Sequence, residues 1–131
     1  MTANPTGIAP VFLVRDMEKN IDFWCSRLGF QVERYGEPTN FAIVLRGEAR
    51  IMLALASPSA ELIPNWQISE KTSNAFIWVD DVRAMYEEVM ERGAPIDWSL
   101  YEAPWGGLEF GTQDPEGRDI AFGQILNGDE K

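Results

Sequence analysis

The sequence predicts an α+β fold in which one unit, a strand followed by a helix and three further strands, occurs twice. Two segments carry this prediction, because each joins a short β-type run, an aspartate, an amphipathic helical pattern and a glycine. The matching residues Asp16 and Asp81 lie half a chain length apart. We predict one domain over residues 1–131, with an internal duplication of 8–56 and 74–125 and a connection at 57–73.

Each predicted unit opens with a strand and a capped helix. The strands, 9–14 and 74–79, are rich in β-branched and aromatic residues. Asp16 and Asp81 stand where helix N-caps belong, because a carboxylate there accepts otherwise unpaired backbone N–H groups. Apolar residues then recur at helical spacing: Met17, Ile21, Trp24 and Leu28 in the first unit, and Val82, Met85, Tyr86, Val89 and Met90 in the second. Gly29 and Gly93 are expected to end the helices.

Three strands are expected after each helix. They are 31–36, 40–46 and 50–56 in the first unit, and 96–101, 107–113 and 118–125 in the second. Tight turns join the last two strands of each unit, at Gly47-Glu48 and at Asp114-Pro115-Glu116-Gly117.

Side-chain alternation gives each strand two faces. One set is apolar and is predicted to form the core: Phe12, Val14, Ile51, Leu53, Leu55, Ala75, Ile77, Val79, Ile120 and Phe122. The other set is mixed: Ala9, Val11, Leu13, Met52, Ala54, Ala56, Asn74, Phe76, Trp78, Asp119, Ala121 and Gly123. This mixed face either packs against another layer or subunit, or forms a ligand cleft lined by aromatic residues.

Composition narrows the function. The chain has no histidine and a single cysteine, Cys25, which excludes Ser-His-Asp and Cys-His catalysis and a Cys/His zinc site. The net charge of −10 disfavours nucleic acid and anionic membranes, and it either attracts a cationic ligand or simply keeps the protein soluble. No apolar run is long enough for a membrane span, and residues 1–7 lack the pattern of a signal peptide, so we expect a cytoplasmic protein.

The order of these motifs resembles the vicinal oxygen chelate superfamily, which includes glyoxalase I, extradiol dioxygenases and bleomycin-resistance proteins. The resemblance covers about residues 8–125 and rests on VRDM, FW and LGF in the first unit, then VDDV, Y and RGA, and finally DPEG. It implies paired βαβββ modules whose mixed sheets curl around a cleft, often completed across a dimer.

The resemblance also identifies four positions that hold the metal ligands in the metal-using members. Here they carry Ala9, Ala54, Asn74 and Ala121, all on the mixed face. A single amide cannot hold a transition ion that needs several N, O or S donors. We therefore expect a vacated metal site, no metal and no cofactor, although a cation bound at other carboxylates stays open.

Within the superfamily, the chain is most similar to the metal-free bleomycin-resistance type. The similarity lies at Pro10, Leu45-Arg46-Gly47, Trp66, and Trp105-Gly106-Gly107 before Asp114-Pro115. Such proteins are homodimers that sequester a cationic glycopeptide antibiotic at the subunit interface without chemistry. In them the N-terminal segment around the proline crosses to the partner.

The candidate ligand-binding residues combine aromatic rings with carboxylates, which suit flat and cationic ligands. They are Trp66, Phe76, Trp78, Trp98, Glu102, Trp105, Glu109 and Asp119. Each tryptophan can instead fill a core or an interface, and Glu102 and Glu109 can be solvated surface groups. Because the mixed face also carries Val11, Leu13 and Met52, an apolar aromatic ligand fits as well as a glycopeptide.

Three functions follow from these observations. The leading hypothesis is a dimeric, metal-free protein that sequesters a small aromatic or cationic compound. The alternative is a metal-independent lyase or isomerase that uses Glu102, Glu109 or Asp119 as a base. A purely structural dimer module is the third, and the mixed composition of the cleft face speaks against it.

Overall fold

A computed structural model describes residues 2–126 and contains two four-stranded sheets of mixed direction. The first half contains β1 (Val11–Val14), α1 (Met17–Asp22), the π-helical η1 (Phe23–Arg27), β2 (Gln31–Tyr35), β3 (Phe41–Arg46) and β4 (Ala49–Leu55). The second half contains α2 (Asn65–Ile68), β5 (Ala75–Trp78), α3 (Val82–Glu91), β6 (Ile96–Glu102), β7 (Gly107–Gln113) and β8 (Asp119–Ile125). The predicted α+β fold with two βαβββ units is confirmed.

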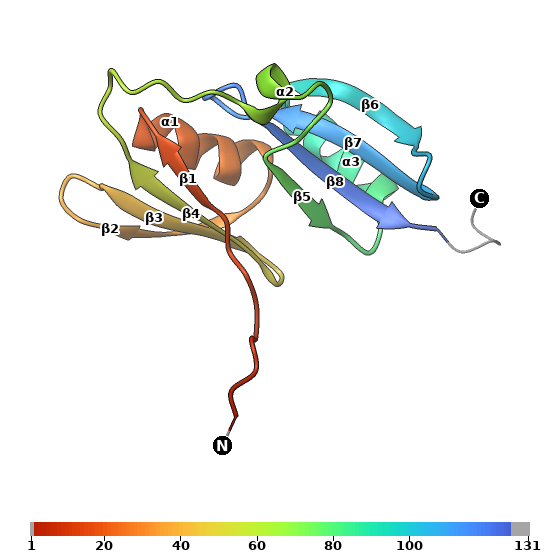
Figure 1. Ribbon diagram of the computed structural model, residues 1–131, viewed down its shortest axis with the longest axis horizontal. Helices are drawn as coiled ribbons and strands as arrows, with labels where there is room; N and C mark the ends of the chain where they lie inside the picture. Colours follow the sequence, from red (N-terminus) through yellow and green to blue (C-terminus); the bar gives the residue numbers. More distant parts are fainter. Residues whose placement is uncertain (1, 127–131) are drawn as a thin grey trace.

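The two sheets have the same strand order. The first sheet runs β1-β4-β3-β2 and the second runs β5-β8-β7-β6. In each, the opening strand pairs in parallel with the last strand, and the remaining pairs are antiparallel. The two halves lie side by side, with α1 over the first sheet and α3 behind the second (Figure 1).

The predicted helix ends are confirmed. The side chains of Asp16 and Asp81 accept backbone N–H groups three residues later, from Lys19 and Ala84, each at 3.1 Å. Gly29 and Gly93 have φ angles of +76° and +78°, which only glycine adopts without strain. The first helix differs from the expectation in its second half, where Leu28 N donates to Phe23 O at 3.2 Å in a π-helical turn.

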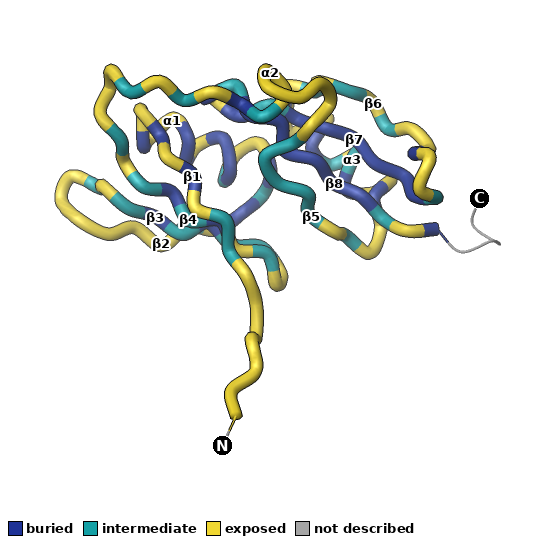
Figure 2. The backbone as a smooth tube through the Cα atoms, in the orientation of Figure 1, coloured by how far each residue is buried: buried dark blue, intermediate teal, exposed yellow. Residues whose placement is uncertain are grey.

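The core lies between the helices and one face of each sheet (Figure 2). Most of the predicted core side chains are buried or packed against the core, including Val14, Leu53 and Ile120 at 0% exposure. Leu55 is an exception and corrects the prediction, because 46% of it is exposed at the end of β4, where the chain leaves the sheet. Among residues 2–126, no helix is long and apolar enough to cross a membrane.

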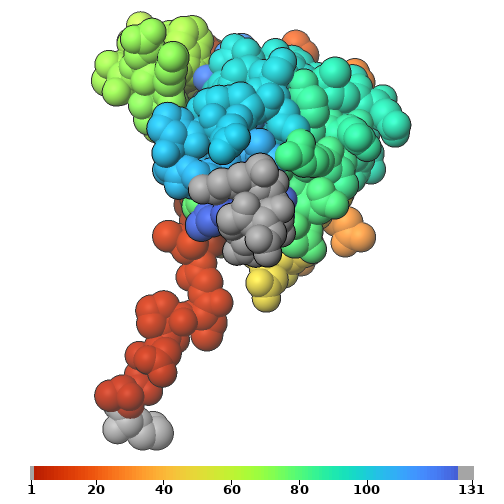
Figure 3. All heavy atoms as spheres, turned by 90° about the vertical axis from the view of Figure 1, so that its right-hand side faces the viewer, coloured from red at the N-terminus to blue at the C-terminus, as the bar shows by residue number. Residues whose placement is uncertain are grey.

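Residues 2–8 form an exposed arm. This segment leads away from the body in an extended path (Figures 1 and 3). It contains Ile8, which is 92% exposed, and it leads directly into Pro10 and β1. An arm of this kind makes few contacts with its own chain.

A buried carboxylate connects the two halves. Glu116, in the turn between β7 and β8, accepts hydrogen bonds from the backbone N and the Nε of Arg15, both at 2.8 Å, and from Nδ2 of Asn20 at 3.1 Å. Burial alone raises the pKa of Glu116, but the hydrogen bonds from Arg15 and Asn20 outweigh it, so this pKa lies below its usual range. The turn of the second half is thereby fixed to β1 and α1 of the first.

Arg118 makes a second connection from the same turn. Its guanidinium donates to the backbone oxygen of Leu13 and lies 4.7 Å from the ring centroid of Phe12. Asp114 holds the turn in shape, because its Oδ1 accepts the backbone N–H groups of Glu116 and Arg118, each at 2.9 Å. The Asp-Pro-Glu-Gly turn therefore joins the halves as well as two strands.

We predict that Glu116→Ala lowers the free energy of unfolding by about 2–3 kcal/mol, because three donors lose a buried acceptor and Arg15 stays partly solvated. Urea denaturation measures the change. Glu18→Ala, which breaks an exposed ion pair with Arg34, is the matched control and should change stability far less. Equal losses in the two variants would contradict a central role for Glu116.

Candidate functional site

A cavity of about 820 Å³ lies on the face of the second sheet that does not form the core. This volume is within the range of small-molecule sites. Strands β5 to β8 form its floor, and the end of the connection closes one side. Its lining residues are Trp66, Glu70, Lys71, Thr72, Ser73, Phe76, Asp97, Trp98, Ser99, Tyr101, Trp105, Glu109 and Asp119.

Three aromatic rings of the cavity lie against glycines of the sheet. A Cβ atom at Gly111 would overlap the ring of Trp98, one at Gly123 would overlap Phe76, and one at Gly107 would overlap Trp105. Glycine is therefore required at these positions, because a side chain there would occupy the space of each ring. Ala121 of β8, which pairs with Phe76 of β5, is only 1% exposed.

Phe76 and Trp105 belong to a larger aromatic group. Their ring centroids are 6.0 Å apart, and Trp78 lies 4.6 Å from Phe76 and 5.4 Å from Trp105. Trp78 does not line the cavity itself, but it supports two rings that do. It borders a second groove of about 510 Å³ between the two halves.

The carboxylates of the cavity have different environments. Glu109 is nearly buried and accepts a 2.8 Å hydrogen bond from the Tyr101 hydroxyl, which raises the pKa of Tyr101. Asp119 is only 2% exposed, and its Oδ1 accepts a 3.1 Å bond from Nε2 of Gln113. Burial, reinforced by the neighbouring Asp97 carboxyl, raises the pKa of Asp119 to about 6.

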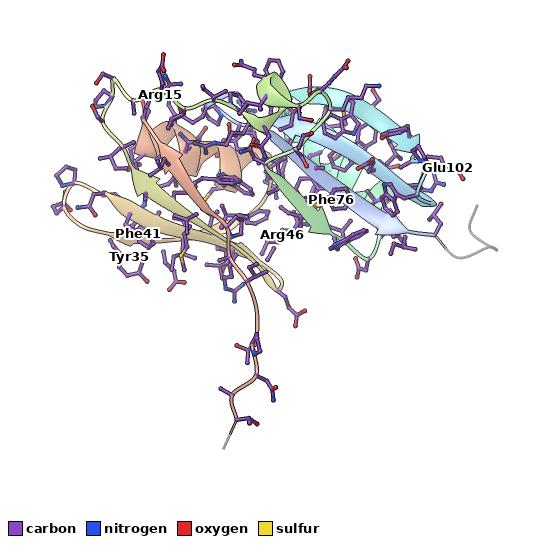
Figure 4. The ribbon with its side chains drawn as sticks, viewed as in Figure 1. Arg15, Tyr35, Phe41, Arg46, Phe76 and Glu102 are labelled. Atoms are coloured by element: carbon purple, nitrogen blue, oxygen red, sulfur yellow. The ribbon has the colours of Figure 1, made fainter. Side chains whose placement is uncertain are left out.

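The cavity brings together six of the eight residues predicted from the sequence as ligand-binding: Trp66, Phe76, Trp98, Trp105, Glu109 and Asp119. Trp66 is held in place by its Nε1, which donates to the backbone oxygen of Gly117 at 2.6 Å. Glu102 is not among the lining residues. It is exposed at the last position of β6 and lies away from Phe76 (Figure 4).

Sequence reasoning missed Asp97 and Tyr101. β6 has irregular register against β7 on both sides of Trp98, so its alternation is broken. As a result Trp98 and Tyr101, an odd number of residues apart, both line the cavity. No signal in the sequence marks this irregularity.

The four positions at which the sequence predicts a vacated metal site do not fit a metal. The side chains of Ala9, Ala54 and Ala121 offer no donor atom. The Oδ1 of Asn74 is occupied by the backbone N–H of Asn65, at 3.0 Å. Within residues 2–126, no group of three or more His, Cys, Asp or Glu side chains is placed to hold a metal ion.

The face of the first sheet opposite α1 is apolar and open. Val11 is 59% exposed and Leu13 is 49% exposed, and Met52 and Ile43 pair beside Val11 in the sheet. Tyr35 and Phe41 lie on the same face, with ring centroids 6.0 Å apart (Figure 4). We call this surface, made of Val11, Leu13, Tyr35, Phe41, Ile43 and Met52, the open face.

Comparison with known proteins identifies one superfamily. Residues 7–122 match the family model of the Glyoxalase/Bleomycin resistance protein/Dioxygenase superfamily. A bleomycin resistance protein of Geobacillus stearothermophilus is 25% identical over an alignment of 132 positions. The alignment covers 89% of this chain and 95% of the relative.

Solved structures share the fold. The bleomycin-binding protein of bleomycin-producing Streptomyces verticillus, in complex with copper(II)-bleomycin, superposes with a TM-score of 0.71 at 26% identity and covers 96% of this chain and 100% of its own. A superfamily protein of Alicyclobacillus acidocaldarius gives a TM-score of 0.74 at 17% identity, covering 98% of each chain, and supports the fold alone.

We predict that Gly111→Ala displaces the Trp98 ring and destabilises the protein by about 1–3 kcal/mol, because the added methyl group occupies the space of the ring. Denaturation measures the stability, and the near-UV circular dichroism reports the ring. Gly7→Ala is the control, since nothing lies within 4 Å of its added methyl group. An unchanged spectrum in Gly111→Ala would show that Trp98 does not lie on the sheet.

Proposed function

Because the chain belongs to the glyoxalase/bleomycin resistance protein/dioxygenase superfamily, we propose that it is a metal-free binding protein that sequesters a small aromatic or cationic compound, as bleomycin-resistance proteins do. The observation that carries this proposal is the cavity, whose walls combine five aromatic side chains with four carboxylates. Aromatic rings bind flat groups and cations, and carboxylates favour positive charge. Binding without a metal is supported by the residues at the four predicted metal positions, which are three alanines and Asn74, whose oxygen already accepts a hydrogen bond.

Charge supports a cationic ligand. Lys71 is the one basic residue among the residues lining the cavity, against Glu70, Asp97, Glu109 and Asp119. The whole chain carries a net charge of −10, which attracts cations over distances set by the salt concentration. A bleomycin-type glycopeptide meets these requirements.

The proposal includes a homodimer in the cytoplasm. The open face leaves Val11, Leu13 and Tyr35 in contact with water, which is costly for a single chain. The arm of residues 2–8 makes few contacts with its own chain and is free to cross to a partner. The single cysteine agrees with a reducing compartment.

One observation favours the alternative of a metal-independent lyase or isomerase. Asp119 lines the cavity, is buried and has a pKa raised to about 6, as a general base requires. Glu109 also lines the cavity, whereas Glu102 lies outside it. An enzyme would turn over a substrate and would keep binding it after Asp119→Asn, whereas a sequestering protein would show no turnover.

We predict saturable binding of metal-free or copper(II)-bleomycin, seen as a change in tryptophan fluorescence and as heat in calorimetry. Trp98→Ala should weaken binding roughly tenfold or more, because aromatic side chains in a pocket dominate binding energy. Binding should also weaken as salt is raised.

The matched control is Met90→Ala, an exposed apolar residue of α3 on the opposite side of the second sheet from the cavity. This variant should bind like the wild type. No response at high micromolar bleomycin would refute the bleomycin assignment, and equal weakening in both variants would place the ligand outside the cavity.

We predict that the protein sediments with twice the mass of one chain and that Leu13→Asp makes it monomeric, because a charge on the open face cannot be buried without a partner. Met90→Asp places the same charge on the helix side and should leave the dimer intact. A wild-type protein that is monomeric at high micromolar concentration would contradict the dimer.

A further inference from the structure

Two carboxyl groups meet in the wall of the cavity. Asp119 at the start of β8 is 2% exposed, and Asp97 on β6 lines the same cavity and is near enough to raise the pKa of Asp119. A hydrogen bond between two carboxyl groups needs a proton on one of them, and without that proton two negative charges stand side by side. We refer to Asp97 and Asp119 as the carboxyl pair.

The part of the chain that the structure describes forms no ion pair with these two carboxyl groups. The ion pairs within residues 2–126 are Arg15–Glu116, Arg34–Glu18, Arg46–Glu88, Arg92–Glu88 and Arg118–Asp114, and none includes Asp97 or Asp119. Gln113 provides one neutral N–H group to Asp119. A buried carboxylate normally has a cationic partner, because burial without one is costly. Asp119 has no such partner among residues 2–126, so a cation bound in the cavity can provide one.

The surroundings of the pair select the kind of cation. Trp98 follows Asp97 directly and lies against Gly111, so a planar surface adjoins the carboxyl groups. A planar group that carries several N–H donors fits this arrangement, since it can stack on the ring and donate to the carboxylates.

Resting on the proposed binding function, we propose that the carboxyl pair is the subsite for a protonated nitrogen group of the ligand, an amidinium or ammonium next to an aromatic ring. The N–H donors of this group bind the two carboxyl groups in place of the missing cationic partner. A quaternary ammonium ion has the charge but no N–H group, so it gains the electrostatic attraction without the hydrogen bonds. A neutral amide of the same shape gains neither the charge nor the charge-assisted bonds.

Binding at this subsite depends on pH. The charged and titratable groups that act on Asp119 are Asp97 and Asp114, and the cavity adds Glu70, Lys71, Tyr101 and Glu109. The pKa of Asp119 is raised to about 6, so the group is ionised at pH 8 and largely protonated at pH 5. A cation therefore competes with a proton and binds more weakly in acid.

The test uses three aromatic probes of similar size on the full chain: benzamidine, which carries a planar N–H cation, phenyltrimethylammonium, a cation without N–H groups, and neutral benzamide. Tryptophan fluorescence and ligand-observed NMR give the dissociation constants. At pH 8 we expect benzamidine to bind about 10- to 100-fold more tightly than benzamide, from charge-assisted hydrogen bonds, and more tightly than phenyltrimethylammonium. Between pH 8 and pH 5 its affinity should fall about tenfold.

Asp119→Asn and Asp97→Asn should each remove this preference for benzamidine over phenyltrimethylammonium. Glu87→Gln removes the same charge from the exposed side of α3, where no cavity lies, and should keep it. The Asn variants preserve the shape of the side chain, and their circular dichroism reports folding. If Asp119→Asn does not fold, Asp97→Asn alone decides, because Asp97 is exposed.

The outcomes separate this inference from the proposed function. Equal binding of the three probes, a preference unaffected in Asp97→Asn, or no pH dependence would overturn the subsite. Bleomycin binding without any benzamidine binding would also overturn it while supporting the proposed function. A pH-dependent benzamidine preference without bleomycin binding would support the subsite and refute the bleomycin-type ligand.

Discussion

The arrangement of the two halves depends on one buried acceptor, the Glu116 carboxylate, which binds the backbone and side chain of Arg15 and the amide of Asn20. These partners lie at the end of β1 and in α1, so one turn of the second half fixes the first half at its opening strand. Arg118 adds a bond to Leu13 from the same turn, and the Trp66 side chain donates to the backbone of Gly117. The turn thus positions the first half, the second sheet and the wall of the cavity together.

The floor of the cavity depends on a different constraint: β7 and β8 carry glycine, which has no side chain, at three positions beneath the aromatic rings. Gly107, Gly111 and Gly123 allow Trp105, Trp98 and Phe76 to lie directly on the backbone. Aromatic rings that are supported in this way have little freedom to rotate, so less side-chain entropy is lost when a ligand stacks on them. The sequence places Ala121 and Gly123 on the mixed face of β8, and in the structure the Phe76 ring lies close to Gly123 on this face.

Most of the fold could be predicted because each element carries a local signal. Asp16 and Asp81 cap their helices as expected, and alternation assigned Ile120 and Phe122 to the core. What could not be predicted depends on contacts between distant segments or on broken periodicity. The irregular register of β6 brings Asp97 and Tyr101 to the cavity and leaves Glu102 outside it. The roles of Glu116 and Arg118 as links between the halves could not be predicted either, because the turn motif does not indicate which residues of the first half they contact.

Without a metal, a cavity on this fold must obtain its specificity from side chains. At the four positions where the sequence predicts a vacated metal site, the side chains are small or already hydrogen-bonded, and the charged groups that line the cavity are mostly carboxylates, including those on β6, β7 and β8. A metal recognises oxygen atoms of its ligand, whereas carboxylates recognise N–H groups and positive charge. A cavity lined in this way therefore suits cations better than electron-pair donors. The fold alone cannot carry this information, because it lies in the few side chains that face the cavity.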